Sequence, residues 1–187
     1  MTFETKLRKF LDKYHKGYYI EKYIINDGEK HPVAVICLGG GYHWICSFSE
    51  GMPYAKKLNR MGYKKYGLPK PAAIILSYPV ITMYEKAHKG SRRYLLGDNP
   101  SLQMLEQASV EKQITADYPP TFVWHGLADK DVNPDNSKLL TEKFIEKGVK
   151  YRCVTYDGVD HGVGIGEGLP CDGWFEKAVC FWENCFS

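Results

Sequence analysis

The sequence predicts an α/β fold with a mainly parallel sheet flanked by helices. Three observations lead to it: short apolar runs recur along the 187-residue chain, amphipathic segments separate them, and glycine-rich or polar segments follow several of the runs directly. Alternating strands and helices are typical of layered α/β proteins, whose parallel strands are buried on both faces. In such sheets a site lies at the carboxyl ends of the strands. The segments that follow the runs are therefore the candidates for chemistry.

The first third of the chain predicts two strands and a helix. Residues 17–25 alternate aromatic and β-branched side chains, as a half-buried edge strand does. Residues 33–38 form an apolar run that ends in three glycines, which is typical of a buried parallel strand. Ser47 and Glu50 have the spacing of a helix capping box, so we expect a helix over 50–61.

The rest of the chain predicts three more strands and three helices. The strands are apolar runs, at 72–78, 121–125 and 150–156. The helices are expected over 101–108 with Ser101 or Asn99 at the start, over 134–147 with Gly148 at the end, and over 173–185. The residues expected to face the core are Leu139, Leu140, Phe144 and Ile145 in the second helix and Trp174, Val179, Phe181 and Trp182 in the third. No repeat or linker divides the chain, so we expect one domain over 1–187.

Composition excludes several classes of protein. Hydrophobic residues make up 44% and aromatic residues 14% of the chain, which predicts a sizeable core. The net charge of +3 is small and the basic residues are scattered, so we expect no nucleic-acid partner. No run has transmembrane length and the N-terminus lacks the apolar core of a secretory signal, which predicts no membrane association and a cytoplasmic location.

The six cysteines show no spacing typical of zinc ligands, so we expect no metal and no other cofactor. In a reducing compartment they would be small buried hydrophobic residues. A secreted domain is the open alternative.

Three segments that follow predicted strands carry candidate site residues. Gly39–Gly41 would let backbone N–H groups approach an oxyanion or a phosphate, or would form an ordinary turn. Asp129 could orient a histidine, with Asp131 and Asp135 as alternatives, although aspartate in loops commonly serves turns and helix caps. His161 is a candidate general base on a glycine-bordered loop.

Two other histidines lie close to these segments in the sequence. His125 adjoins the apolar run TFVW and is expected to be structural. His43 follows the three glycines and could line a pocket.

In this order, LGGGY at 38–42, WHGLADKDV at 124–132 and VDHGVG at 159–164 resemble the α/β-hydrolase superfamily, most closely its acetyl-esterase and acetyl-xylan-esterase branch. The resemblance covers nearly the whole chain. It implies a serine carboxylesterase acting on short acyl esters, such as a small acetyl ester or an acetylated saccharide. It also implies that backbone N–H groups of Gly40 and Gly41 form the oxyanion hole, that Asp129 is the triad acid and that His161 is the triad base.

The nucleophile implied by the resemblance is not identifiable. The sequence contains no Gly-x-Ser-x-Gly, and only KKYGLPK stands where the family has the block with the nucleophile elbow. We therefore expect an internal deletion between Tyr63 and Pro71, a truncated α/β-hydrolase-like domain and impaired turnover. Ser49, in SFSEG, keeps the last half of the elbow pattern and is the remaining candidate, but the capping box explains this segment without catalysis.

Two further interpretations stay open. One is a non-catalytic protein of the same fold that binds a small ester or an acetylated saccharide. The other is a fragmentary gene product with no independent role. The deletion would expose apolar surface that the missing helices cover in the family, so a homo-oligomer is one expected state.

Overall fold

The computed structural model describes residues 73–185, which all belong to one compact unit of the chain. The strands predicted over 17–25 and 33–38, the helix predicted over 50–61 and the bridge between Tyr63 and Pro71 lie outside the described residues.

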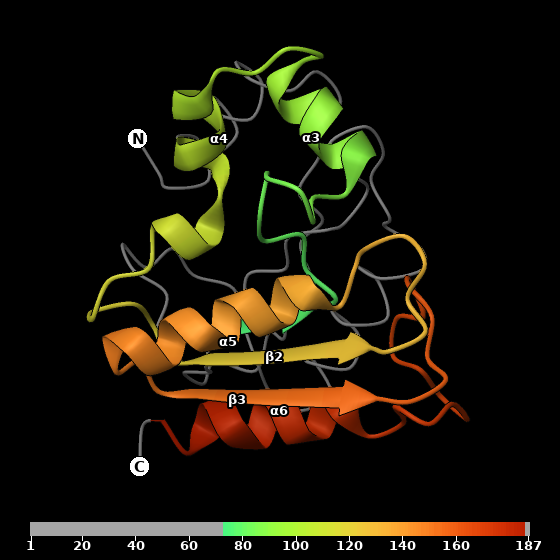
Figure 1. Cartoon of the computed structure of the whole chain (residues 1–187). Coiled ribbons are helices and arrows are strands. Elements are labelled where there is room, and N and C mark those ends of the chain that lie inside the picture. The colour runs from blue at the N-terminus through green and yellow to red at the C-terminus, as the bar shows by residue number, and fades with distance from the viewer. Residues whose placement is uncertain (1–72, 186–187) are drawn as a thin grey trace, which may run out of the picture. The chain divides into compact units, whose positions relative to one another are not determined.

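The described residues contain a three-stranded parallel sheet, in the order β1 (Ile74–Ser77), β2 (Thr121–Gly126) and β3 (Tyr151–Tyr156) (Figure 1). All three strands were predicted within two residues of their ends. β2 is fully buried, as expected for a central parallel strand. Because the strands are parallel, their carboxyl ends lie at one edge of the sheet, where the loops after β2 and β3 begin.

Two helices cover opposite faces of β2. His125 of β2 contacts Ser137 of α5 (Asp135–Lys147), whereas Trp124, the preceding residue, packs its ring 4.9 Å from Trp174 of α6 (Trp174–Glu183). Successive side chains of a strand point to opposite faces, so α5 and α6 sandwich the sheet (Figure 1).

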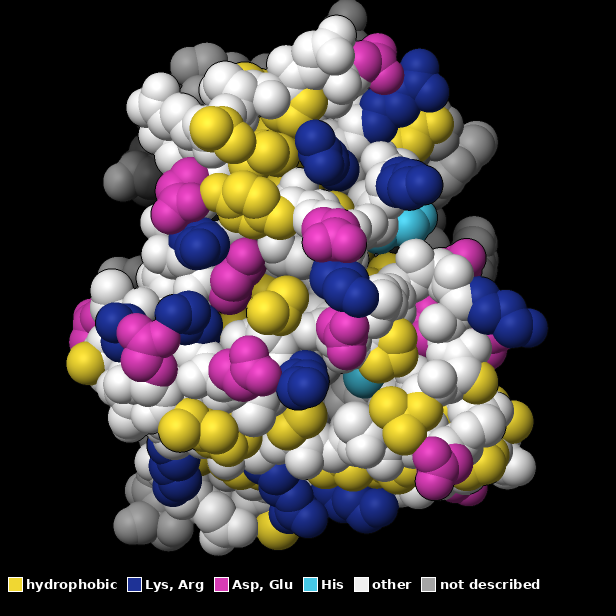
Figure 2. Space-filling model, viewed as in Figure 1, with side chains coloured by type: hydrophobic (Ala, Val, Ile, Leu, Met, Phe, Trp, Pro, Cys, Tyr) yellow, Lys and Arg dark blue, Asp and Glu magenta, His cyan; other side chains and the backbone are white. Residues whose placement is uncertain are grey.

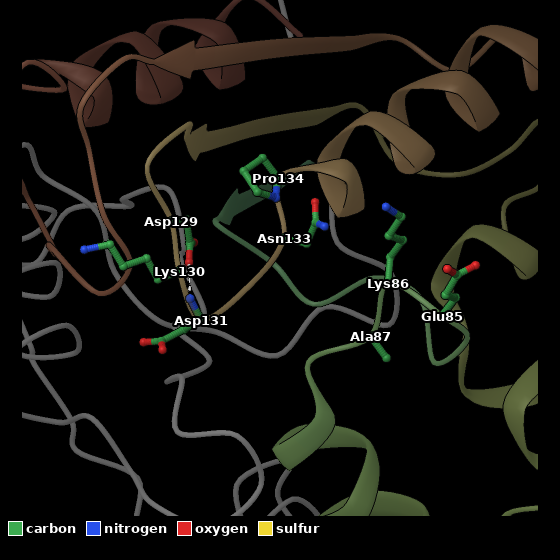
Figure 3. Close-up of a pocket in the computed structure, with 8 residues that line it drawn as sticks. All are labelled: Glu85, Lys86, Ala87, Asp129, Lys130, Asp131, Asn133 and Pro134. Atoms are coloured by element: carbon green, nitrogen blue, oxygen red, sulfur yellow. Dashed lines mark hydrogen bonds between the residues drawn. The ribbon is translucent and has the colours of Figure 1, made fainter.

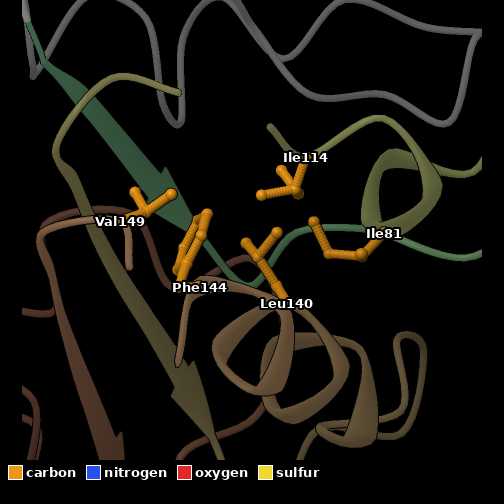
Figure 4. Packing of buried hydrophobic residues seen from close by; sticks show 5 residues of the cluster. All are labelled: Ile81, Ile114, Leu140, Phe144 and Val149. Atoms are coloured by element: carbon orange, nitrogen blue, oxygen red, sulfur yellow. The ribbon is translucent and has the colours of Figure 1, made fainter. Parts of the chain in front are cut away.

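The core between α5 and the sheet is aliphatic and aromatic. Figure 4 shows its buried members, which come from α5, from the loops after β1 and η2 and from the turn before β3: Ile81, Ile114, Leu140, Phe144 and Val149. Leu140 and Phe144 are four residues apart and so share one face of the helix. The prediction that Ile145 belongs to this face is wrong, because it lies about 100° around the helix from Phe144 and is 65% exposed.

The core on the α6 side is aromatic. Trp174 and Val179 are buried there as predicted, while Phe181 and Trp182 are only partly buried. Phe175 and Ala178 are buried instead and were not predicted. The cysteines were expected to be buried, which holds for Cys171; Cys180, one residue after Val179, faces outward and is exposed.

The connection from β1 to β2 carries α3 (Lys89–Leu96), α4 (Leu102–Ala108) and a short 3₁₀ helix, η2 (Val110–Lys112). Ser101 begins α4, since its hydroxyl accepts a hydrogen bond from the N–H of Met104 at 3.2 Å. α3 was not predicted. It is capped by the imidazole of His88, which accepts from the N–H of Ser91, and histidine is not among the residues that usually mark a helix start.

Basic and acidic side chains are interspersed on the face drawn in Figure 2, with hydrophobic groups between them. Within residues 73–185, no helix has the length and apolar character needed to span a membrane.

One buried amide joins the loop after β1 to the start of α5. Asn136 is fully buried, and its Oδ1 accepts hydrogen bonds from the N–H groups of Ile81 and Thr82 at 2.9 and 3.1 Å. Its Nδ2 donates to the carbonyls of Lys86 and Asn133, both at 2.9 Å. The side chain therefore makes four hydrogen bonds, two accepted and two donated, which is the full capacity of an amide.

Replacing Asn136 by aspartate should destabilise the fold by about 2–4 kcal/mol, because the new carboxylate would face two carbonyl oxygens without a proton to donate. Urea unfolding at pH 7.5 measures the change in the free energy of unfolding. The matched control is Asn133→Asp. Asn133 is exposed and its Oδ1 accepts from the N–H of Asp135, which a carboxylate can also do, so this change should stay within about 0.5 kcal/mol. Equal effects of the two substitutions would contradict the assigned role of Asn136.

Candidate active site

The loops after β2 and β3 bring together two of the predicted site residues. Asp129 lies in the loop between β2 and α5, and His161 lies in the loop between β3 and α6. Oδ2 of Asp129 is 2.8 Å from Nδ1 of His161, although the residues are 32 positions apart in the chain. The shared edge of the parallel sheet accounts for this meeting, as the sequence predicted.

A tight turn holds Asp129. Its Oδ1 accepts hydrogen bonds from the N–H groups of Asp131 and Val132 at 2.9 and 2.8 Å, and its side chain is fully buried. These local bonds are typical of aspartate in loops. They fix one carboxylate oxygen to the backbone and leave Oδ2 for imidazole donors.

The two loops are also in direct backbone contact. The N–H of Ala128 donates to the carbonyl of Val159 at 3.1 Å. A Cβ placed on Gly126 would lie 2.2 Å from that same carbonyl oxygen, so only glycine fits at the end of β2. Close approach of the backbones thus sets the separation between Asp129 and His161.

His161 is bounded by an aromatic ring from β1. Its imidazole lies 4.6 Å from the ring of Tyr78, centroid to centroid, at an interplanar angle of 62°. Tyr78 follows β1 with φ of 37°, an uncommon conformation for a non-glycine residue, and its hydroxyl accepts from the N–H of Gly164 at 3.3 Å. The side chain of His161 is 27% exposed. Tyr78, which follows β1, and Asp129, which follows β2, therefore flank this imidazole, which itself follows β3.

The exposed residue Asp160 links the loop after β2 to the loop after β3. Its Oδ1 accepts from the N–H groups of His161 and Lys130 at 2.8 and 3.1 Å. Those two backbone hydrogen bonds lower the pKa of the Asp160 carboxyl below its usual range. The alternative acids from the sequence do not meet His161: Asp135 pairs with Lys86 at 3.2 Å, and Asp131 contributes its backbone N–H to Asp129.

His125 is buried, as predicted for a structural histidine, but it also contacts Asp129. Its Nε2 lies 3.0 Å from Oδ2 of Asp129 and 3.0 Å from the carbonyl of Val132, and its Nδ1 lies 2.7 Å from the hydroxyl of Ser137. Sequence reasoning missed this contact. The available signal was the spacing of four residues between His125 and Asp129 across the end of a strand.

The candidates from the first part of the sequence lie outside the residues that the structure describes. Gly40, Gly41 and Ser49, like Gly39 and His43, lie outside residues 73–185. Ser77 lies at the end of β1, where its hydroxyl accepts from Nε1 of Trp124 at 2.9 Å. In the described part of the chain, no group of three or more His, Cys, Asp or Glu side chains has an arrangement that could hold a metal ion.

A polar pocket of about 320 Å³ adjoins Asp129. Residues of the loop after β1 line one side and residues of the loop after β2 line the other (Figure 3): Glu85, Lys86, Ala87, Asp129, Lys130, Asp131, Asn133 and Pro134. The pocket offers ammonium, carboxylate and amide groups, a set suited to a hydroxyl-rich or charged small molecule.

Gly126→Ala should destabilise the fold by about 3 kcal/mol, because the added methyl group meets a backbone carbonyl that cannot rotate away. The control is Gly158→Ala, where φ is 69° and no atom lies within 4 Å of the new Cβ, so only the cost of the left-handed conformation, roughly 1 kcal/mol, is expected. Urea unfolding of both variants tests this order, and a smaller loss for Gly126→Ala would contradict it.

Stability should fall as the pH is lowered through the titration of His125. Burial lowers the pKa of His125 below its ordinary value of 6.5, against the opposing effects of the Val132 carbonyl and the Asp129 charge. The unfolded chain then binds a proton near pH 6.5 that the folded chain does not bind, so His125 contributes stability above pH 6.5 that is lost below it. Urea unfolding between pH 7.5 and 5.5 should show this slope, and His125→Gln should reduce it. An unchanged slope in the variant would contradict the assignment.

Comparison with known proteins agrees with this architecture. Residues 72–187 match the model of the prolyl oligopeptidase family. Over 105 residues the chain is 35% identical to endo-1,4-beta-xylanase B of Butyrivibrio fibrisolvens, a match that covers 56% of this chain and 16% of that protein.

Two solved structures share the fold. An acetyl ester-xyloside bifunctional hydrolase from Caldicellulosiruptor lactoaceticus superposes with a TM-score of 0.80 at 21% identity, over 87% of this chain and 86% of that one. A sugar hydrolase from Lactococcus lactis gives 0.68 at 17% identity, over 88% and 97%. The predicted α/β-hydrolase fold is confirmed, and the chain belongs to the prolyl oligopeptidase family.

Proposed function

We propose that this chain carries the acid and histidine of a serine carboxylic ester hydrolase, with Asp129 as the acid and His161 as the general base. The observation that carries the proposal is the 2.8 Å contact between Oδ2 of Asp129 and Nδ1 of His161. A carboxylate at that distance requires a proton on Nδ1, which leaves the lone pair of Nε2 to accept a proton from a nucleophile. The buried carboxylate would stabilise the imidazolium that forms.

The complete reaction needs two further parts, an oxyanion hole and a nucleophile. The sequence offers the backbone N–H groups of Gly40 and Gly41 as the oxyanion hole. It offers no serine in a nucleophile elbow. In the reaction of the family, the serine oxygen would bond to the acyl carbon as its proton passes to Nε2 of His161, and the alcohol would leave with that proton.

Short acyl esters, and acetylated saccharides in particular, are the substrate class we propose. The names of similar proteins support it, since they include a xylanase and an acetyl ester-xyloside hydrolase. The polar pocket beside Asp129 supports it as well, because ammonium and amide groups can bind sugar hydroxyls.

We further propose that turnover is impaired because the nucleophile is missing. Loss of a catalytic serine from a complete triad costs on the order of 10⁶-fold in kcat. An assay with p-nitrophenyl acetate, with His161→Gln as the blank, should therefore show little activity above the blank. A serine-directed fluorophosphonate should leave no adduct detectable by intact-protein mass spectrometry. Robust activity that the fluorophosphonate abolishes would overturn the impairment and identify a serine, with Ser49 to be tested first by Ser49→Ala.

The second candidate function is binding of the same ligands without hydrolysis, which the open polar pocket favours. Addition of an acetylated xylo-oligosaccharide to ¹⁵N-labelled protein should shift the amide resonances of Lys130 and Asn133, with no release of acetate. Lys130→Ala should weaken the titration, while Lys138→Ala, on the exposed side of α5, should not. Absence of any shift at millimolar saccharide would exclude this function.

A further inference from the structure

A second imidazole contacts the carboxylate of Asp129 from the interior of the protein. His125 is fully buried on β2, and its Nε2 lies 3.0 Å from Oδ2 of Asp129, the same oxygen that meets His161. Its other nitrogen, Nδ1, lies 2.7 Å from the hydroxyl of Ser137 in α5. A continuous line of hydrogen bonds therefore runs from α5 through β2 to the imidazole of His161.

The surroundings of His125 determine which nitrogen carries the proton. Nε2 faces two acceptors, the carboxylate of Asp129 and the carbonyl of Val132, each at 3.0 Å. Neither can donate, so Nε2 must carry hydrogen. Nδ1 faces a hydroxyl that can donate to it, and burial favours the neutral ring by lowering the pKa of His125. The arrangement is that of a neutral imidazole with a fixed N–H donor.

We propose that His125 is a positioning residue for Asp129: its Nε2–H holds the carboxylate in the orientation that meets Nδ1 of His161. This inference rests on the proposed roles of Asp129 and His161. The backbone N–H groups of Asp131 and Val132 restrain only Oδ1. Without His125, the free oxygen would be restrained by the partly exposed His161 alone.

Ser137 contributes to the same positioning of Asp129 through His125. It is 1% exposed, and its hydroxyl is the partner that Nδ1 of His125 requires if Nε2 is to remain the donor. Ser137 lies in the first turn of α5, one residue after Asn136, which fixes that turn to the loop after β1. Through Ser137 and His125, the orientation of the Asp129 carboxylate thus depends on the start of α5.

The test uses the imidazole N–H resonances of the full-length, ¹⁵N-labelled chain. The Nδ1–H of His161 should give a downfield proton signal, assigned by its loss in His161→Gln. In His125→Met, which keeps bulk but has no donor, exchange of that proton with water should rise about tenfold, the equivalent of losing one hydrogen bond. In His125→Gln, whose amide can donate to Oδ2, exchange should stay within about twofold of the wild-type rate.

Three outcomes distinguish the positioning role of His125 from the proposed roles of Asp129 and His161. Unchanged exchange in a folded His125→Met variant overturns the positioning role while leaving the Asp129–His161 pair intact. A wild-type spectrum without the His161 Nδ1–H signal overturns the proposed function and this inference together. If His125→Met does not fold, Ser137→Ala decides: exchange should rise by about threefold, since the ring loses one of its restraints, and no rise overturns the role.

Discussion

The buried carboxylate of Asp129 is the constraint on which the rest of the site depends. A carboxylate out of water is stable only when donors surround it, and four donors do so: two backbone N–H groups at Oδ1 and two imidazoles at Oδ2. These donors come from three parts of the structure. The backbone groups shape the turn after β2, His125 belongs to the core of the sheet, and His161 arrives on the loop after β3.

The parallel sheet is what makes this convergence possible. The register of β1, β2 and β3 aligns their carboxyl ends, so Tyr78, Asp129 and His161 leave the sheet at one edge. Two further contacts then set their separation: the approach of Gly126 to Val159, and the bonds from Asp160 to both loops. The four bonds of Asn136 keep the start of α5 in place behind them.

Much of this could be predicted from the sequence, because it depended on periodicity and on position after a strand. The three strands, α4, α5, α6 and the pairing of Asp129 with His161 were of this kind. The failures have physical reasons. α3 begins at a histidine cap, Ile145 sits at the border of an amphipathic face, and Cys180 follows the last buried position of its turn. The link between His125 and Asp129 was missed because a spacing of four residues across the end of a strand brings two side chains together only when the loop turns back, as it does here.

Asp129 serves both the fold and the candidate site. A residue whose carboxylate closes a turn and accepts from a core imidazole contributes to folding, whatever the rate of turnover. Loss of this carboxylate should therefore weaken the scaffold as well as the candidate site. His161, whose side chain is 27% exposed, carries less of that burden, so the fold depends more on the acid of the pair than on its histidine.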